Sequence, residues 1–304
     1  MLSLCCPKLL ANRKGETYAM TLTLLESGFP IFAAVSVAAL GSLYAYFYSL
    51  LFASIALLIW WGGQGRWVEL KKRAAYKPLL MTSLFITGLY ICLFLALHYT
   101  SAANVALILF LQVLFGFLFL GHKKEEQLGK YSLLGALLMM VGAMVVVFPG
   151  EVKINIGDGL ALLAAMLAPL ANLYQKQARL HLSSQSILMV RSVIALPFVL
   201  LLAWLLEPSP SFQQVIEQFW PLLFVGVLIL VLSKVLWIEA IHLLPITTVS
   251  AFFAFTPLLT MLWSDWFLEQ PPAWYQWLGA MPIILGSILL TRTLPVKETQ
   301  NKST

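Results

Sequence analysis

Charged residues are scarce in this chain: only 11% of its 304 residues are Asp, Glu, Lys or Arg, whereas 61% are hydrophobic. Soluble domains carry about 25% charged residues, and the mean hydropathy here is +0.88. The composition therefore excludes an ordinary soluble protein and indicates an integral membrane protein. The net charge of +6 requires no nucleic-acid partner, because basic residues that orient membrane helices account for it. We expect the lipid bilayer, and no nucleic acid, as a partner.

Residues that perform chemistry are also few, with three cysteines and four histidines. Cys92 lies within an apolar run, away from the adjacent Cys5 and Cys6, so no disulfide framework is indicated. The sequence has no His-Glu-x-x-His, Cys-x-x-Cys or Gly-x-Ser-x-Gly pattern. We therefore expect no metal, no cofactor and no enzyme activity. A Walker A sequence is absent as well, so transport by this chain would use a gradient or exchange.

Long apolar runs are what the chain does have. A helix needs about 17–25 mainly apolar residues to cross the hydrocarbon core of a bilayer. Such runs fall near residues 20–40, 42–61, 79–97, 102–120, 132–149, 158–175, 186–206, 220–241, 246–268 and 274–291. They are continuously apolar, which favours helices over the alternating pattern of a barrel. The sequence thus predicts an all-α membrane protein with ten transmembrane helices. The first run contains Glu26, Gly28 and Pro30, so nine helices remain an alternative.

The basic residues predict the orientation. If the N-terminus is cytoplasmic, the inner segments hold nearly all Lys and Arg, and the outer loops hold only Lys153. The positive-inside rule favours this arrangement, so we expect both termini in the cytoplasm of a bacterium and the helices in its inner membrane. The predicted organisation is a cytoplasmic leader (1–19), a first five-helix repeat (20–149), a second five-helix repeat (157–292) and a cytoplasmic tail (293–304).

The two halves resemble each other. Moved forward without a gap, Ala96–Gly142 falls on Ala240–Gly286 and matches several alanines, leucines and glycines. A unit with an odd number of spans, copied in tandem, must cross the bilayer in opposite orientations. Inverted repeats of this kind are the usual framework of alternating-access carriers. The pattern therefore predicts two inverted repeats and suggests transport.

Ionisable residues inside the spans are the first candidates for a site, because a charge in lipid is costly unless it faces a bundle interior or a cavity. Glu26, Arg191 and Lys234 all lie about 8–12 Å from the same predicted membrane face, at 1.5 Å per residue. If they meet, they offer partners for a zwitterion such as an amino acid, and Glu26 can carry a coupling proton. The alternative is a structural pair between Glu26 and Lys234 or Arg191, or a side chain that extends to the interface.

Other polar residues and prolines mark the possible walls of a cavity. Gln112 and Thr256 occupy equivalent repeat positions in the middle of their spans. A buried Gln must find a partner, whereas Thr can bond to its own helix backbone, so Gln112 is the stronger candidate. Pro169 and Pro257 are candidates for kinks that serve gating. Tyr90 and Trp237 are deep enough to stack on a substrate, although packing is the more common role of such residues.

Short motifs in both halves resemble one family. They are Leu95-Ala96-Leu97-His98-Tyr99-Thr100-Ser101-Ala102, Leu133-Leu134-Gly135-Ala136, Val141-Gly142, Ala240-Ile241-His242-Leu243-Leu244-Pro245, Thr256-Pro257-Leu258-Leu259 and Trp277-Leu278-Gly279-Ala280. In this order they resemble two EamA domains of the drug/metabolite transporter superfamily. The resemblance implies a transporter but no substrate, since the superfamily moves amino acids, nucleotide-linked molecules, cationic drugs and other metabolites. The chain departs from the pattern at two positions. Members usually carry proline where this chain has Val113, and the arginine that is frequent in the second span of each domain is present as Arg191 but replaced by Phe47 at the equivalent position of the first repeat.

We predict a secondary transporter that moves a small polar or amphipathic metabolite by alternating access. An amino acid-like substrate and export are favoured. Uptake or exchange of a nucleotide-like metabolite such as S-adenosylmethionine is an alternative, as is a non-transporting scaffold or a membrane enzyme. A homodimer is compatible with the sequence. The sequence does not identify the coupling ion.

Overall fold

The computed structural model describes residues 5–62, 69, 71–120, 131–147, 155–243, 249 and 252–291, and every regular element in these ranges is a helix. The first half contains α1 (Cys5–Leu40), α2 (Ser42–Gly62), η2 (Arg73–Ala75), α3 (Tyr76–Tyr99), α4 (Ala102–Leu109), α5 (Gln112–Leu120) and α6 (Ser132–Val147). The second contains α7 (Ile156–Arg179), α8 (Ser184–Leu206), α9 (Phe212–Glu217), α10 (Phe219–Leu223), η3 (Phe224–Ser233), α11 (Lys234–Leu243), α13 (Thr256–Leu268) and α14 (Trp274–Thr291).

The helices confirm the predicted class, an all-α integral membrane protein. Within the described ranges, seven helical segments are long and apolar enough to cross a bilayer, including Arg13–Leu40 in α1. The first apolar run is therefore part of a helix of sufficient length, and this helix begins at Cys5 inside the expected leader. α6 contains a shorter apolar helix, and α13 and α14 complete the second half. The count of ten spans remains a prediction.

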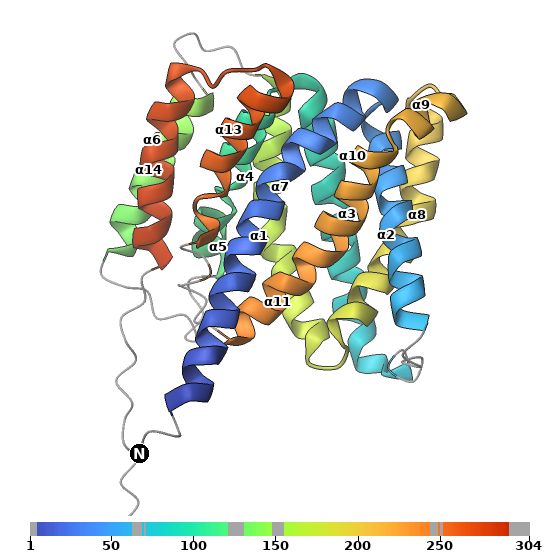
Figure 1. The fold of residues 1–304 in the computed structure, drawn as a ribbon, viewed down its shortest axis with the longest axis horizontal. Coiled ribbons are helices and arrows are strands. Elements are labelled where there is room, and N and C mark those ends of the chain that lie inside the picture. The colour runs from blue at the N-terminus through green and yellow to red at the C-terminus, as the bar shows by residue number, and fades with distance from the viewer. Residues whose placement is uncertain are drawn as a thin grey trace, which may run out of the picture.

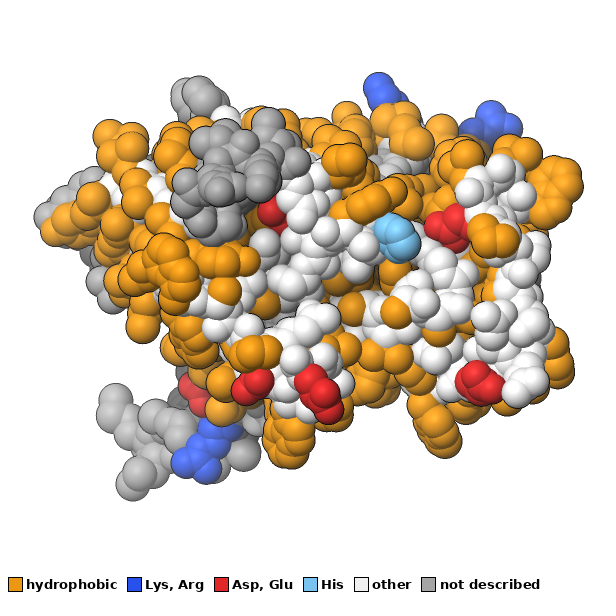
Figure 2. Space-filling view, turned by 90° about the horizontal axis from the view of Figure 1, so that it is seen from above, with side chains coloured by type: hydrophobic (Ala, Val, Ile, Leu, Met, Phe, Trp, Pro, Cys, Tyr) orange, Lys and Arg blue, Asp and Glu red, His pale blue; other side chains and the backbone are white. Residues whose placement is uncertain are grey.

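The elements run up and down through one bundle (Figure 1). α1 begins at the lower end of the view, and α14 runs downward toward that end. The start of α1 and the end of α14 are thus directed to the same side of the bundle. At the opposite end, the face seen in Figure 2 carries acidic side chains, while Lys and Arg appear only at its rim. The orientation of these two ends in the membrane remains a prediction.

α6 and α14 pack against each other through glycines at repeat-equivalent positions. A Cβ atom on Gly142 would lie 2.6 Å from the carbonyl oxygen of Gly279, and one on Gly286 would lie 2.5 Å from that of Gly135. Gly142 and Gly286 are equivalent in the two halves, as are Gly135 and Gly279. Each half therefore presents the same glycine face to the other in reversed direction, which is the relation expected between inverted repeats.

α2 and α8 also interact reciprocally: a carboxylate that follows each helix caps the start of the other. Glu207, which follows α8, accepts hydrogen bonds from the backbone N–H groups of Ser42, Leu43 and Tyr44 at the start of α2. Glu69, which follows α2, accepts from the backbone N–H of Ser183 at the start of α8. A carboxylate at a helix N-terminus satisfies free N–H groups and complements the helix dipole. Each repeat thus caps a helix of the other.

Candidate functional site

Glu26 and Lys234 form an ion pair within the bundle. Lys234 Nζ donates to Glu26 Oε1 over 2.6 Å, and the side chains are only 27% and 12% exposed, respectively. The hydroxyl of Ser233 donates to the same carboxylate oxygen. Glu26 belongs to the first repeat and Lys234 to the second, so the pair joins the two halves. The structure therefore brings together two of the three predicted charges as the direct pair that the sequence left as an alternative.

The residue after Glu26 ties α1 to α13. Thr260 donates to the carbonyl oxygen of Ser27 over 2.8 Å, and the indole N–H of Trp263 donates to the Ser27 hydroxyl over 3.0 Å. Both donors lie on α13, one turn apart. These two hydrogen bonds therefore join α13 to α1 at the residue next to Glu26.

Arg191 is the third predicted charge, and its surroundings differ. It lies on α8 with only 5% of its surface exposed. Its electrostatic neighbours are the hydroxyl groups of Tyr46 and Tyr90. Within the described part of the chain, no carboxylate pairs with Arg191, and no hydrogen bond to its guanidinium is present. A buried guanidinium that lacks an anionic partner is costly, so Arg191 is the strongest candidate for contact with a bound anion.

Tyr90 connects the two charged groups. It lies within electrostatic range of both Lys234 and Arg191. Its ring stacks on Tyr46 with centroids 5.7 Å apart and meets the edge of Phe29 at 5.9 Å. The predicted position of Tyr90 deep in the bundle agrees with its place in this aromatic cluster, which also contains Phe94. The charged residues are thus bordered by aromatic surface.

Gln112 and Thr256 each open a half-helix after a break in the chain. α4 ends at Leu109 and α5 begins at Gln112, while the turn at Ala254 and Phe255 precedes α13. These two breaks occur at equivalent positions of the repeats, and they lie close together, because the rings of Phe110 and Phe253 are 6.1 Å apart. Discontinuous helices near the middle of the membrane are a recurring feature of transporter sites.

The two polar side chains at these breaks differ in burial. The Thr256 hydroxyl is buried and has no hydrogen-bond partner among the described residues. Gln112 is partly buried, and no described residue is hydrogen-bonded to it. A polar group that is buried without a partner calls for a physical explanation, and contact with a transported ligand would provide one for Thr256.

The structure places the remaining three candidates, Trp237, Pro169 and Pro257, within packed helices. Trp237 is partly buried and meets the ring of Phe253 edge to face at 5.6 Å. Pro169 lies buried within α7, which continues through it. Pro257 lies in the first turn of α13, where the missing N–H has no intrahelical partner to lose. The break therefore precedes Pro257, and the proline starts a helix where a kink in mid-helix was expected.

Several residues of this region were not selected from the sequence. Tyr46 is one of them: only 1% of its surface is exposed, and it lies within electrostatic range of Arg191. Ser27, Ser233 and Trp263 form the hydrogen bonds around Glu26. Ser27 and Ser233 are adjacent in sequence to Glu26 and Lys234, and this adjacency was their only signal. Ser is too common in membrane helices for that signal to single them out.

Comparison with known proteins agrees with this architecture. The family model of the EamA-like transporter family matches residues 13–148 and 155–292. An uncharacterized transporter of Archaeoglobus fulgidus is 24% identical over 299 residues, covering 92% of this chain and 98% of that protein. An uncharacterized transporter of Synechocystis is 23% identical over 209 residues, covering 65% and 60%. A solved crystal structure with 15% identity covers 90% of this chain and 95% of its own with a TM-score of 0.66, which shows a shared fold.

The fold and the central polar residues define a helical membrane protein built from two inverted repeats, the class to which many carriers belong. The two segments matched by the family model correspond to these repeats. The chain belongs to the EamA-like transporter family, as the resemblance of its motifs predicted. Membership of this family indicates a membrane transporter rather than an enzyme.

Proposed function

We propose that this protein is a secondary active transporter of a small amphipathic metabolite that carries a carboxylate, with amino acid-like molecules as the favoured class. The observation that carries the proposal is Arg191, a buried cation without a carboxylate partner in the described chain. A guanidinium binds a carboxylate through two parallel hydrogen bonds, which makes Arg well suited to this role.

The state of the other two charges supports an acidic group on the substrate. Glu26 and Lys234 neutralise each other over 2.6 Å, so Arg191 supplies the uncompensated charge of the site. A single cation favours a monocarboxylate over a multiply charged phosphate, whose charge would call for several basic groups. The rings of Tyr46 and Tyr90 lie next to Arg191 and are 1% and 5% exposed, so they would contact a substrate only after the helices around them move apart. They could then face the body of the substrate and, for an amino acid, its ammonium group.

The arrangement of helices supports alternating access. The ion pair joins α1 of one repeat to α11 of the other, and both breaks face the same region through Phe110 and Phe253. Hinge-like segments next to a site between inverted repeats allow one repeat to move against the other. The favoured placement is the inner membrane of a bacterium with both termini in the cytoplasm, because the basic residues lie at the end where α1 begins. Export is the favoured direction, because it is the commonest role in the superfamily that the motifs resemble.

Counterflow into proteoliposomes tests this function. Vesicles that contain the purified protein are loaded with unlabelled metabolites, and the entry of labelled amino acids, nucleosides and S-adenosylmethionine is followed. We expect labelled amino acids to accumulate with the native protein and with Arg179→Gln, whose arginine is exposed at the end of α7. We expect Arg191→Gln to abolish accumulation while the protein remains folded.

Chemical analogues of the accumulated substrate separate the role of its carboxylate from that of its body. The matching amide or methyl ester should compete poorly for the native protein, because it offers Arg191 no anion. Accumulation of nucleosides alone would reject the carboxylate substrate and keep the carrier. No accumulation of any compound by a folded protein would argue against the proposed substrates and favour a role other than their transport.

A further inference from the structure

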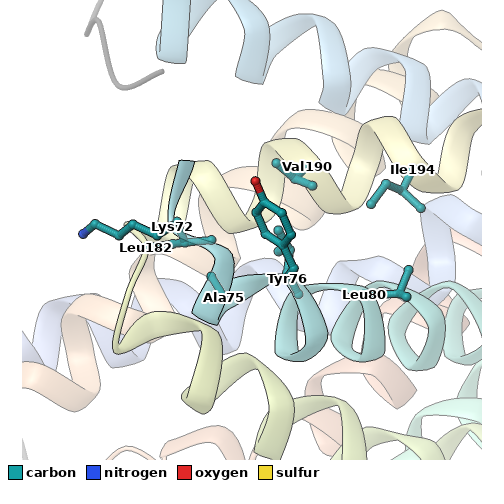
Figure 3. Close-up of a pocket in the computed structure, with 8 residues that line it drawn as sticks. Lys72, Ala75, Tyr76, Leu80, Leu182, Val190 and Ile194 are labelled. Carbon is teal, nitrogen blue, oxygen red and sulfur yellow. The ribbon is translucent and has the colours of Figure 1, made fainter. Parts of the chain in front are cut away.

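A second site lies on the outer surface of the bundle, at the end where the basic residues gather. A groove of about 390 Å³ runs between the start of α3 and the start of α8. Tyr76, Leu79 and Leu80 line it on the α3 side, and Val190 and Ile194 line it on the α8 side. Figure 3 shows these side chains along the groove and Lys72 at one end of it.

The groove is apolar and faces outward. Among the described residues that line it, Lys72 is the one that carries a charge, and the other side chains are aliphatic or aromatic. Leu80 and Tyr76 are each 53% exposed, and Ile194 is 41% exposed. α3 and α8 both have the length and hydropathy of membrane spans, so this surface meets lipid acyl chains. A concave apolar surface of this kind can hold one chain in a defined position.

The mouth of the groove carries an excess of positive charge. Lys71, Lys72, Arg73 and Lys77 are all exposed within one short segment. The acidic residue of the same segment, Glu69, is turned to the N-terminus of α8, where Ser183 and Ser186 donate to its carboxylate. Among the described residues, no ion pair joins these basic groups to a carboxylate beside the groove.

Lys72 is held in place at this mouth. Its amine donates to the carbonyl oxygen of His181 over 3.0 Å. In Figure 3 its nitrogen points away from the apolar side chains while its carbon stem contributes to the lining. This is the arrangement in which a lysine covers apolar surface with its stem and presents its charge to the polar region of a membrane.

We propose that this groove is a binding site for an anionic phospholipid, which places an acyl chain between Leu80 and Ile194 and its phosphate among Lys71, Lys72 and Arg73. Apolar lining next to a basic cluster at the membrane surface matches both parts of such a lipid. A second protein copy would need no basic cluster at the edge of the groove, so the charge favours lipid as the occupant. The site is separate from the central charges and does not depend on the identity of the transported substrate.

Native mass spectrometry of the full chain in detergent tests the proposal, with phosphatidylglycerol and phosphatidylcholine titrated separately. Each basic residue near an anionic membrane surface contributes about five-fold in affinity. We expect Lys71→Gln/Lys72→Gln to weaken phosphatidylglycerol binding by roughly 25-fold and to leave phosphatidylcholine binding unchanged. The control Arg13→Gln/Lys14→Gln removes two exposed charges from α1 and should bind both lipids as the native protein does.

A variant of the groove itself completes the test. Ile194→Trp fills the groove from an exposed position, so the fold should tolerate it, and phosphatidylglycerol binding should fall even though every basic residue remains. Raising the salt concentration should weaken phosphatidylglycerol binding by the native protein more than by Lys71→Gln/Lys72→Gln. Equal binding of both lipids, or unchanged phosphatidylglycerol binding in both variants, would overturn the proposal. Loss of a protein dimer in Ile194→Trp with unchanged lipid binding would assign the groove to a second copy.

Discussion

Gly142 and Gly279 lie backbone against backbone where α6 crosses α14. A Cβ atom on Gly142 would be 2.6 Å from the Gly279 carbonyl oxygen, and a Cβ atom on Gly279 would be 2.8 Å from the Gly142 carbonyl oxygen. Contacts this short leave no room for a side chain on either residue. The close approach allows the two helices to pack by van der Waals contact over their full length, which is the main attraction available between helices in lipid.

Gly142→Ala should therefore destabilise the protein by about 2 kcal/mol, since an added methyl group in a close-packed contact forces the backbones apart. Gly116→Ala is the matched control, because a Cβ atom there meets nothing within 4 Å. It should be neutral or slightly stabilising, as expected when alanine replaces glycine in a helix. Unfolding of both variants by titration with denaturing detergent, followed by circular dichroism, measures the difference. Equal stability of the two variants would contradict the tight crossing.

The Glu26–Lys234 pair predicts strong coupling between its members. Glu26→Gln or Lys234→Met alone leaves a largely buried charge without its partner and should cost about 2–4 kcal/mol. The double variant should recover part of this loss, because it leaves no isolated charge. The same unfolding titration, carried out on all four proteins of the cycle, gives the interaction energy. Losses that simply add in the double variant would show that the ion pair contributes nothing.

The carboxylates at the two ends of the α2–α8 pair should contribute independently. Glu207→Ala removes the acceptor for three N–H groups at the start of α2, and a loss of about 1–2 kcal/mol is expected for such a cap. Glu69→Ala should act in the same direction at the start of α8, and the two losses should add because the sites are far apart. Hydrogen exchange at Ser42 and Leu43 should accelerate in Glu207→Ala alone. Glu217→Ala, an exposed change near Glu207, serves as the neutral control.

Two threonines on one face of α13 predict opposite effects. Thr260→Val removes the hydrogen bond to Ser27 and leaves its carbonyl oxygen without this donor, so a loss of about 1 kcal/mol is expected. Thr256→Val removes a buried hydroxyl that lacks a partner among the described residues, which should leave stability unchanged or raise it slightly. We expect counterflow to fall in Thr256→Val, because its hydroxyl is available to a substrate. Unimpaired counterflow would make Thr256 a packing residue.

Counting residues along each span predicts the depth of the central charges, whereas the sequence could not predict which of them pair. Glu26, Lys234 and Arg191 were expected at a similar depth, but the sequence does not define how each helix is rotated about its axis. Lys234 follows the segment η3 (Phe224–Ser233), which is a π-helix. The wider turn of a π-helix changes the direction in which later side chains point. Nothing in this apolar stretch signals that change, so the partner of Lys234 remained open between alternatives.

Of the two helix breaks, the sequence marked one and not the other. In the second half, Pro257 marked the region, although it begins α13 and the break lies before it. In the first half Val113 replaces the expected proline, so no residue there announces the break at Phe110 and Leu111. At this break Phe110 packs against Phe253 of the equivalent segment in the other half. A single sequence does not reveal such a tertiary contact, so it could not place the break at the candidate site.

The crossing of α6 and α14 also has a consequence for how the protein is made. α6 leaves the ribosome long before α14, and at ordinary synthesis rates of about 5–20 residues per second the delay is on the order of ten seconds. During that time its glycine face, which is complementary to α14, has only lipid beside it. Insertion factors or other nascent helices have this interval in which to engage the exposed glycines. Assembly of the two halves is therefore completed only after translation has passed α14, and quality control of this protein must tolerate a half-built intermediate in the membrane.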